Sequence, residues 1–138
     1  MTEWNDPPLV FLGGTCNKST WRNKLIRKLK IRYFNPVVDD WNSEARAREL
    51  SVRQRCDICL YVLTPLMTEV YAVAEVVDDS NKRPEKTVFS FLYRDNGKRL
   101  TQGQCRSLNA VGELVRRNGG KWVEFECLPF VLNNWTRR

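Results

Sequence analysis

The sequence predicts a single α/β domain built around a five-stranded parallel sheet. Short apolar runs alternate with longer amphipathic runs along all 138 residues, which is typical of repeated strand–helix units. The run at 58–64 is almost continuously apolar, as expected for a strand whose two sheet faces are both covered. Because crossovers between parallel strands are right-handed, helices should cover both faces and produce a three-layer domain.

The length and composition limit the class of protein. The chain has the size of one domain, and its hydrophobic content of 42% indicates a globular protein. No apolar stretch approaches the roughly 18–20 residues that span a bilayer, and the acidic N-terminus does not resemble a secretory signal. Five cysteines, an odd number, suit reduced thiols better than a disulfide framework. We therefore expect a cytoplasmic protein with no membrane association.

The formal net charge of +7 favours a phosphate-bearing partner. Much of the positive excess lies in the segments 22–32 and 46–55, which are helix-like. A solvated helix face is the commoner explanation of such charge, and nucleic-acid contact is the rarer one. Aromatic residues are not interleaved with the basic ones as a stacking platform requires, so we expect no nucleic-acid partner.

The first half of the chain is expected to hold three strands and two helices. Residues 8–12 predict a buried strand that ends at Gly13-Gly14. Ser19 is a suitable cap for a helix that runs to about Lys30. A short strand at 33–34 is stopped by Asn35-Pro36, a charged helix follows at 43–55, and the third strand occupies 58–64.

The second half continues the alternation. Val70, Val73, Ala74 and Val77 have the spacing of one buried helical stripe. A strand is expected at 87–92 with a polar loop at 94–98, followed by a helix that ends at 118–120, where two glycines favour termination. A last strand at 122–125 and a last helix at 128–135 complete the pattern.

Three segments follow the first three predicted strands and are therefore candidates for a ligand site. Ligands of open α/β sheets bind beyond the carboxyl ends of the strands, where the strand order reverses. The segments are Gly13–Thr15, Pro36–Asp40 and Thr64–Glu69. Glycines allow close approach of a substrate to the backbone, and the helix N-termini nearby favour anions.

The chain lacks the better-known cofactor motifs. Gly13-Gly14 does not have the spacing of a dinucleotide fingerprint or of a P-loop, and it is either a simple turn or a ligand-approach loop. The lone Cys56-x-x-Cys59 has no further ligands for zinc. Because the chain contains no histidine, acid–base chemistry falls to carboxylates, Tyr, Lys or Cys. Paired carboxylates suit glycosidic bond cleavage.

Glu75 is either a solvated helix residue or a catalytic carboxylate. At about 100° per residue it falls opposite the predicted apolar stripe, on a face shared with Tyr71 and Asp78. Periodicity alone therefore predicts an exposed side chain, and the catalytic role is the less favoured of the two interpretations.

Four ordered blocks resemble the nucleoside 2-deoxyribosyltransferase-like family, in a branch of small bacterial and phage proteins. They are 10–17 with 19–22, then 33–41, 56–65 and 74–80. The likeness covers residues 9–92 well and the last third loosely. It implies a flavodoxin-like, Rossmann-like domain that acts on the N-glycosidic bond of a deoxynucleoside or its monophosphate, by transfer or hydrolysis, without metal or cofactor.

The resemblance also implies roles for individual residues. Glu75 matches the nucleophile of the family by position. Glu49, eight residues before Asp57, matches the acidic residue beside the nucleophile and the leaving base. Gly13 and Gly14 match the loop under the sugar and the base.

Further substrate contacts are expected at the strand ends and in the segments next to them. Arg22 suits a 5′-phosphate by paired hydrogen bonds. Glu69 lies six residues before Glu75, where transferases carry an acidic base-binding residue; it would repel a phosphate and so favours nucleosides. Tyr71 is either a residue whose hydroxyl orients Glu75 or a surface tyrosine. The remaining expected contacts are Thr15, Asp40, Asp57 and Thr64.

Family members of this kind complete their site from a neighbouring subunit, so a homo-oligomer is expected. Two rival functions stay open. One is a binding module that captures a nucleotide signal without turnover, which a phage protein would use against host defence. The other, ranked last, is a nucleic-acid binder that uses the basic helices.

Overall fold

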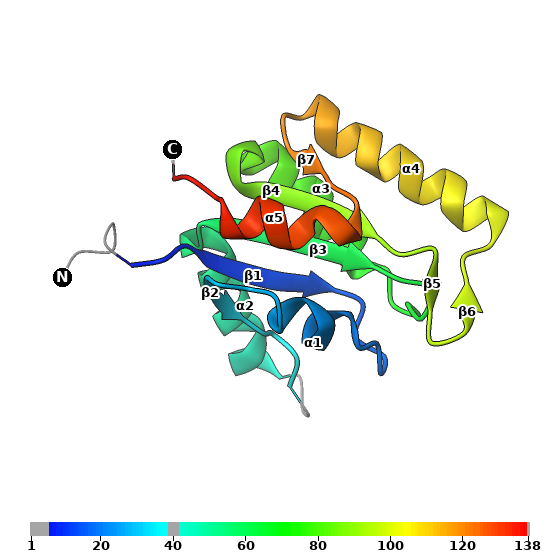
Figure 1. Cartoon of the computed structure of the whole chain (residues 1–138), viewed down its shortest axis with the longest axis horizontal. Coiled ribbons are helices and arrows are strands. Elements are labelled where there is room, and N and C mark those ends of the chain that lie inside the picture. Colours follow the sequence, from blue (N-terminus) through cyan, green and yellow to red (C-terminus); the bar gives the residue numbers. More distant parts are fainter. Residues whose placement is uncertain (1–5, 39–41, 138) are drawn as a thin grey trace.

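Five parallel strands form the main sheet of the computed structural model, which describes residues 6–38 and 42–137 (Figure 1). Their order across the sheet is β2-β1-β3-β4-β7. The strands are β1 (Leu9–Gly14), β2 (Arg32–Phe34), β3 (Ile58–Leu63), β4 (Thr87–Phe91) and β7 (Lys121–Trp122). This is the flavodoxin-like order, in which the direction of winding reverses between β1 and β3. The predicted fold class is confirmed.

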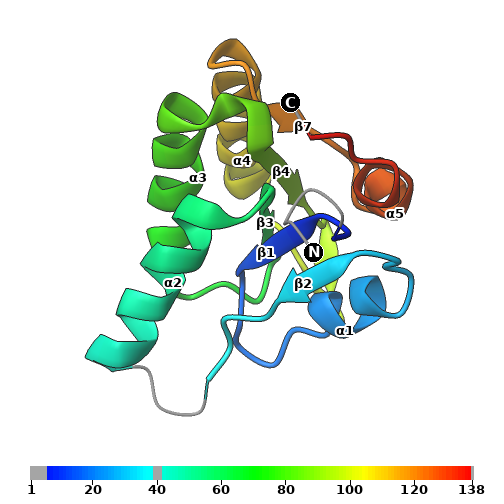
Figure 2. The same ribbon diagram turned by 90° about the vertical axis from the view of Figure 1, so that its left-hand side faces the viewer.

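Helices cover both faces of the sheet and give the expected three layers (Figure 2). One face carries α2, α3 and α4, and the other carries α1 and α5. The helices are α1 (Trp21–Ile26), α2 (Ser43–Arg55), α3 (Tyr71–Lys82), α4 (Gln102–Arg117) and α5 (Leu128–Asn133). Two 3-10 turns, η2 (Pro84–Lys86) and η3 (Phe125–Cys127), precede β4 and α5.

Alternate residues of each central strand enter two separate cores, because side chains of a strand point to opposite faces. In β3, Cys59, Tyr61 and Leu63 pack under α2, α3 and α4. Leu60 and Val62 pack on the other face against α1 and α5. All six residues of β3 are buried, which explains the continuous apolar run seen in the sequence.

The first helix is shorter than predicted. It ends at Ile26 instead of Lys30, and Thr20 takes the N-cap position. The hydroxyl of Ser19 donates to Asp95 and accepts from the backbone N–H of Trp21, the first helical residue, at 3.4 Å. The side chain of Asn133, in α5, accepts from the backbone N–H of Lys30 at 2.7 Å and donates to the carbonyl of Lys28 at 2.9 Å. A tertiary contact therefore replaces the last helical turn.

The predicted buried stripe on α3 is confirmed only in part, since Val73 and Val77 are partly buried against the core but Ala74 is exposed. Val70 is 68% exposed, whereas the buried residues of the helix are Val76, Asp79 and Ser80. The predicted stripe did not include Asp79, because only apolar residues were counted in it. Its burial turns the helix so that Glu75, one helical turn before Asp79, lies at the edge of the buried face.

Smaller differences occur near the C-terminal end. The expected polar loop at 94–98 is part of a two-stranded hairpin, in which β5 (Arg94–Asp95) pairs with β6 (Lys98–Arg99). Its turn residues Asn96 and Gly97 both have positive φ, which matches the twist of a tight hairpin. The last strand begins one residue early and is only two residues long. No helix among the described residues is long and apolar enough to cross a membrane.

Candidate active site

A hollow of about 610 Å³ opens at the carboxyl ends of β1 and β3, where the winding of the sheet reverses. Its floor comes from the two strands, and its walls come from α2, the start of α3 and the segment 36–38. Eight of the predicted site residues line it, namely Gly13, Gly14, Thr15, Arg22, Glu49, Glu69, Tyr71 and Glu75. The placement agrees with the rule that ligands of such sheets bind at this point.

The two glycines form the floor because nothing larger fits there. They are the last residues of β1 and not the loop that the sequence predicted. A Cβ on Gly13 would lie 2.7 Å from the ring of Tyr61, and a Cβ on Gly14 would lie 2.0 Å from the carbonyl oxygen of Val62. Gly14 also has a φ of 121°, which strains any side chain. Both glycines line the hollow, so the end of β1 borders it.

Arg22 and Thr15 hold the loop that follows β1. The guanidinium of Arg22 donates to the carbonyl oxygens of Leu12, Gly14 and Thr15 at 3.0, 3.2 and 2.7 Å, and the residue is only 5% exposed. The hydroxyl of Thr15 accepts from the backbone N–H of Thr64 at 3.0 Å. Arg22 therefore shapes the loop directly, and its expected contact with a phosphate stays a prediction.

A second set of hydrogen bonds ties this loop to the one after β3. The amide of Asn17 donates to the carbonyl of Leu66 at 3.0 Å, to the hydroxyl of Thr68 at 2.8 Å and to the carboxylate of Glu69 at 3.3 Å. The Thr68 and Asn17 donors hold the pKa of Glu69 below its usual range. Glu69 is thus an anion at the rim of the hollow, and its base-binding role stays a prediction.

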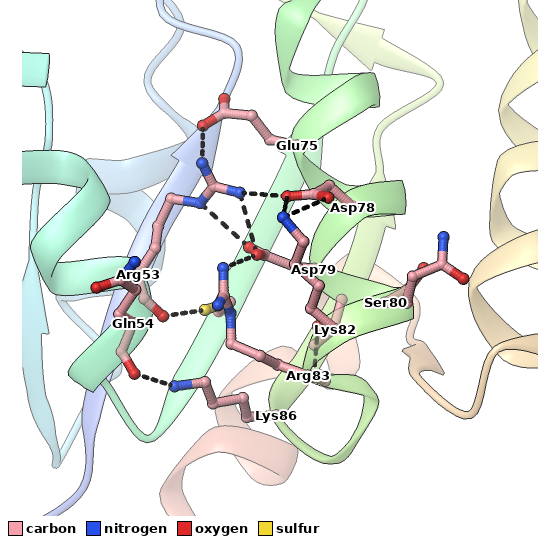
Figure 3. Close-up of polar contacts among 12 residues, drawn as sticks. Arg53, Gln54, Glu75, Asp78, Asp79, Ser80, Lys82, Arg83 and Lys86 are labelled. Atoms are coloured by element: carbon pink, nitrogen blue, oxygen red, sulfur yellow. Dashed lines mark hydrogen bonds and ion pairs between the residues drawn. The ribbon is translucent and has the colours of Figure 1, made fainter.

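Glu75 enters the hollow from the second turn of α3, and its side chain is 15% exposed. The nearest cation is Arg53 of α2, whose Nη1 lies 3.2 Å from one carboxylate oxygen. Figure 3 shows the other carboxylate oxygen of Glu75 directed away from Arg53. The exposed side chain that periodicity predicted for Glu75 is therefore wrong. One oxygen of this half-buried carboxylate contacts Arg53, and the other does not.

The environment raises the pKa of Glu75 from its ordinary 4.5 to about 7. Burial is the largest cause, and the negative charges of Glu49 and Asp79 add to it, while Arg53 acts in the opposite direction. The partial positive charge of a helix N-terminus favours an anion, but the raised pKa of Glu75 indicates that desolvation is the larger effect. A carboxyl group with this pKa exists in both protonation states near neutral pH.

Arg53 belongs to a buried polar network that the sequence did not reveal (Figure 3). Its Nε and Nη2 donate to the two carboxylate oxygens of Asp79 at 3.3 and 3.0 Å. Asp79 also accepts from the hydroxyl of Tyr61 and from Nη2 of Arg83, the latter at 2.6 Å. Arg53 was counted with a solvated basic face, but it is buried. In the sequence, the burial of Arg53 is indicated only by its position beside Val52, an apolar residue of α2 that is also buried.

Three predicted site residues do not meet the hollow or lie outside the described part of the chain. Asp57 is at the opposite end of β3, where it accepts from the backbone N–H of Leu9 at 2.8 Å and from Arg137 at 2.8 Å. Thr64 is fully buried, and its hydroxyl accepts from the N–H of Leu66 at 3.1 Å. Asp40 lies outside the described residues.

The remaining lining of the hollow is largely apolar and includes Phe11, Val37, Val38 and Met67. Val37 and Val38 are partly exposed at its mouth. Apolar walls with a few directed polar groups are typical of small-molecule sites. Among the described residues, no three His, Cys, Asp or Glu side chains gather as a metal-ligand cluster.

Comparison with known proteins gives one match. A family model described as nucleoside 2-deoxyribosyltransferase like matches residues 7–88, which include both glycines, Glu49 and Glu75. No curated protein and no solved structure matches the chain.

Proposed function

The chain belongs to the nucleoside 2-deoxyribosyltransferase-like family, and we propose that it breaks the N-glycosidic bond of a deoxynucleoside or its monophosphate with Glu75 as the nucleophile. One observation carries the proposal. Glu75 is a half-buried carboxylate with a pKa of about 7, and it lines the hollow at the switch point of the sheet together with a second carboxylate, Glu49.

The proposed reaction is a double displacement. An oxygen of ionised Glu75 attacks C1′ of the sugar, and the bond from C1′ to the base nitrogen breaks with its electron pair on the base. Glu49 assists the departure of the base by relaying a proton from solvent to the base nitrogen. Water or a second base then attacks C1′ and releases the Glu75 carboxylate. The charge interaction between the two carboxylates supports their assignment to one site.

The end of β1 and the apolar wall support the assignment of the substrate. Gly13 and Gly14 line the hollow, and we place the sugar against this strand end. Val38 and Met67 offer apolar surface to a base, and anionic Glu69 at the rim would accept hydrogen bonds from its exocyclic amino or ring N–H groups. A homo-oligomer and a cytoplasmic location remain predictions.

Base release tests the proposal. The protein is incubated with each deoxynucleoside and each deoxynucleoside monophosphate, with and without a second base, and free base and new nucleoside are separated by chromatography. We expect Glu75→Gln to lower kcat by about 10³-fold or more, since the nucleophile is lost. Glu44→Gln, which removes an exposed carboxylate at the start of α2, is the matched control and should retain activity.

The pH profile adds a second criterion. Because only ionised Glu75 attacks, kcat/KM should fall as the pH drops below about 7. Absence of base release from every substrate, with tight nucleotide binding by calorimetry, would replace the enzyme with a nucleotide-binding module. Absence of both would overturn the assignment of the site.

A further inference from the structure

We propose that Arg53 is a positioning residue for Glu75, and that Asp79 sets the position of its guanidinium so that one nitrogen stays directed at the nucleophile. This inference rests on the proposed function. It assigns a role to a buried network formed by α2, α3 and β3, in which the resemblance to the family implies a role for Glu75 alone.

The division of the guanidinium nitrogens supports the proposal. Nε and Nη2 of Arg53 both donate to Asp79, at 3.3 and 3.0 Å, whereas Nη1 lies 3.2 Å from Glu75. A planar guanidinium held at two nitrogens has a defined orientation for the third. The Arg53 side chain is 5% exposed, so it has little freedom to swing into water. Asp79 thus defines the direction from which Arg53 meets the nucleophile.

Asp79 is itself held from two other elements. The hydroxyl of Tyr61, a fully buried residue of β3, and Nη2 of Arg83, just after α3, both donate to its carboxylate. Burial alone would raise the pKa of Asp79, but the hydrogen bonds from Arg53 and Tyr61 outweigh it and hold that pKa below its ordinary value. Asp79 therefore stays ionised, and a continuous path of contacts runs from the sheet to Glu75.

A buried network of charged groups contributes little net stability to a fold. Removing two charges from water costs several kcal/mol for each ion, and well-packed apolar residues often serve the fold as well. The geometry indicates a use beyond packing, because the only group of the network that reaches the hollow is Glu75. Arg53 fixes one oxygen of the carboxylate and leaves the other available for attack.

Two replacements of Arg53 distinguish the effect of its positive charge from the effect of its forked guanidinium. Charged groups facing Glu75 are Arg53 and Glu49 from α2 and Asp79 from its own helix. Arg53→Gln removes the positive charge, so the acid limb of kcat/KM should move to higher pH and kcat should fall about 100-fold. Arg53→Lys restores the charge but not the fork, so the limb should return toward neutral pH while kcat stays low. Arg48→Gln, at an exposed position of α2, should change neither.

Replacement of Asp79 tests the other half of the proposal. Asp79→Asn removes a negative charge near Glu75 and releases Arg53, so kcat should fall although the acid limb moves to lower pH. This direction is opposite to that of Arg53→Gln. A solely structural network predicts lower melting temperatures with unchanged kcat and unchanged acid limb in the folded protein. That result, with folding followed by circular dichroism, would overturn the proposal.

A titration that needs no turnover distinguishes this proposal from the proposed function. The carboxyl carbon of Glu75 is followed by NMR in ¹³C-glutamate-labelled protein and assigned with Glu75→Gln. We expect a midpoint of about 7 in the native chain, a higher midpoint in Arg53→Gln and an unchanged one in Arg48→Gln. An unchanged midpoint in Arg53→Gln would overturn the role of Arg53 even in an active enzyme. The expected shift in a protein that releases no base would overturn only the reaction.

Discussion

Glu75 destabilises the fold when it is ionised, since its pKa is about 7 in the folded chain against an ordinary value of 4.5. The folded state binds the proton more tightly than the unfolded state, so stability should decrease as pH rises between these two values. Glutamine carries no charge, and we expect Glu75→Gln to be the more stable protein at about pH 8, by up to about 3 kcal/mol. Urea unfolding followed by circular dichroism measures the difference.

The same experiment at about pH 4 provides the control. Glu75 is then largely protonated in both the folded and the unfolded chain, so the difference in stability between Glu75→Gln and the native chain should largely disappear. Glu44→Gln, an exposed position, should follow the native chain at both pH values. If the native chain were the more stable one at the higher pH, its contact with Arg53 would exceed the desolvation of Glu75, contrary to this prediction.

Single residues differ in how far the sequence identifies them. Gly13, Gly14 and Glu75 follow from strand ends and from resemblance, and the structure brings them together in one hollow. Arg53 and Asp79 could not be found this way, because a charged residue in a polar helix is normally solvated. Their burial depends on mutual contact across two helices, at 3.0 Å, and such pairing across sequence-distant segments leaves no periodic signal.

The packing of α4 on the last strand gives a prediction about a whole element. A Cβ on Gly112 would lie 2.3 Å from the ring of Trp122 in β7, whereas the nearest atom to a Cβ on Gly103, in the same helix, is 3.9 Å away. We expect Gly112→Ala to lower the free energy of unfolding by about 1–3 kcal/mol through overpacking. Gly103→Ala should raise it by about 0.5 kcal/mol.

Thermal and urea unfolding of the two alanine variants measures this contrast directly. Both changes add the same methyl group to the same helix, so their difference in sign reports on the contact with Trp122. Equal stability of the two variants would mean that α4 shifts on the sheet without cost, and would contradict the close contact between Gly112 and Trp122.

Among the helices and strands, those with strong internal patterns were predicted well. β3 and β4 agree closely with their continuous apolar runs, and α4 ends before Gly119 as expected. The elements that differ are those with a decisive tertiary partner. α1 loses its last turn to Asn133, and α3 turns toward Arg53 through Asp79.

The topology of the whole chain explains why the location of the site was predictable although its interior was not. Parallel strands connected by right-handed crossovers force the loops after β1 and β3 to the same edge of the sheet. Asn17 then joins these loops through three hydrogen bonds. The depth and electrostatics of the hollow depend on α2 and α3, whose rotation about their axes is decided by side-chain packing.

The net charge of +7 predicts how the whole molecule attracts its substrate. A deoxynucleoside monophosphate is an anion, whereas the deoxynucleoside is neutral, and the two form a matched pair. Raising the ionic strength from about 0.01 to about 0.15 M shortens the Debye length from about 30 to about 8 Å. We expect kcat/KM for the monophosphate to fall by about tenfold over this range, and that for the nucleoside to stay constant. Where the monophosphate is only an inhibitor, its inhibition constant replaces kcat/KM.

A flat response to salt would show that the anions at the rim, Glu69 among them, cancel the positive field at the mouth of the hollow, and the preferred substrate would then be the neutral nucleoside.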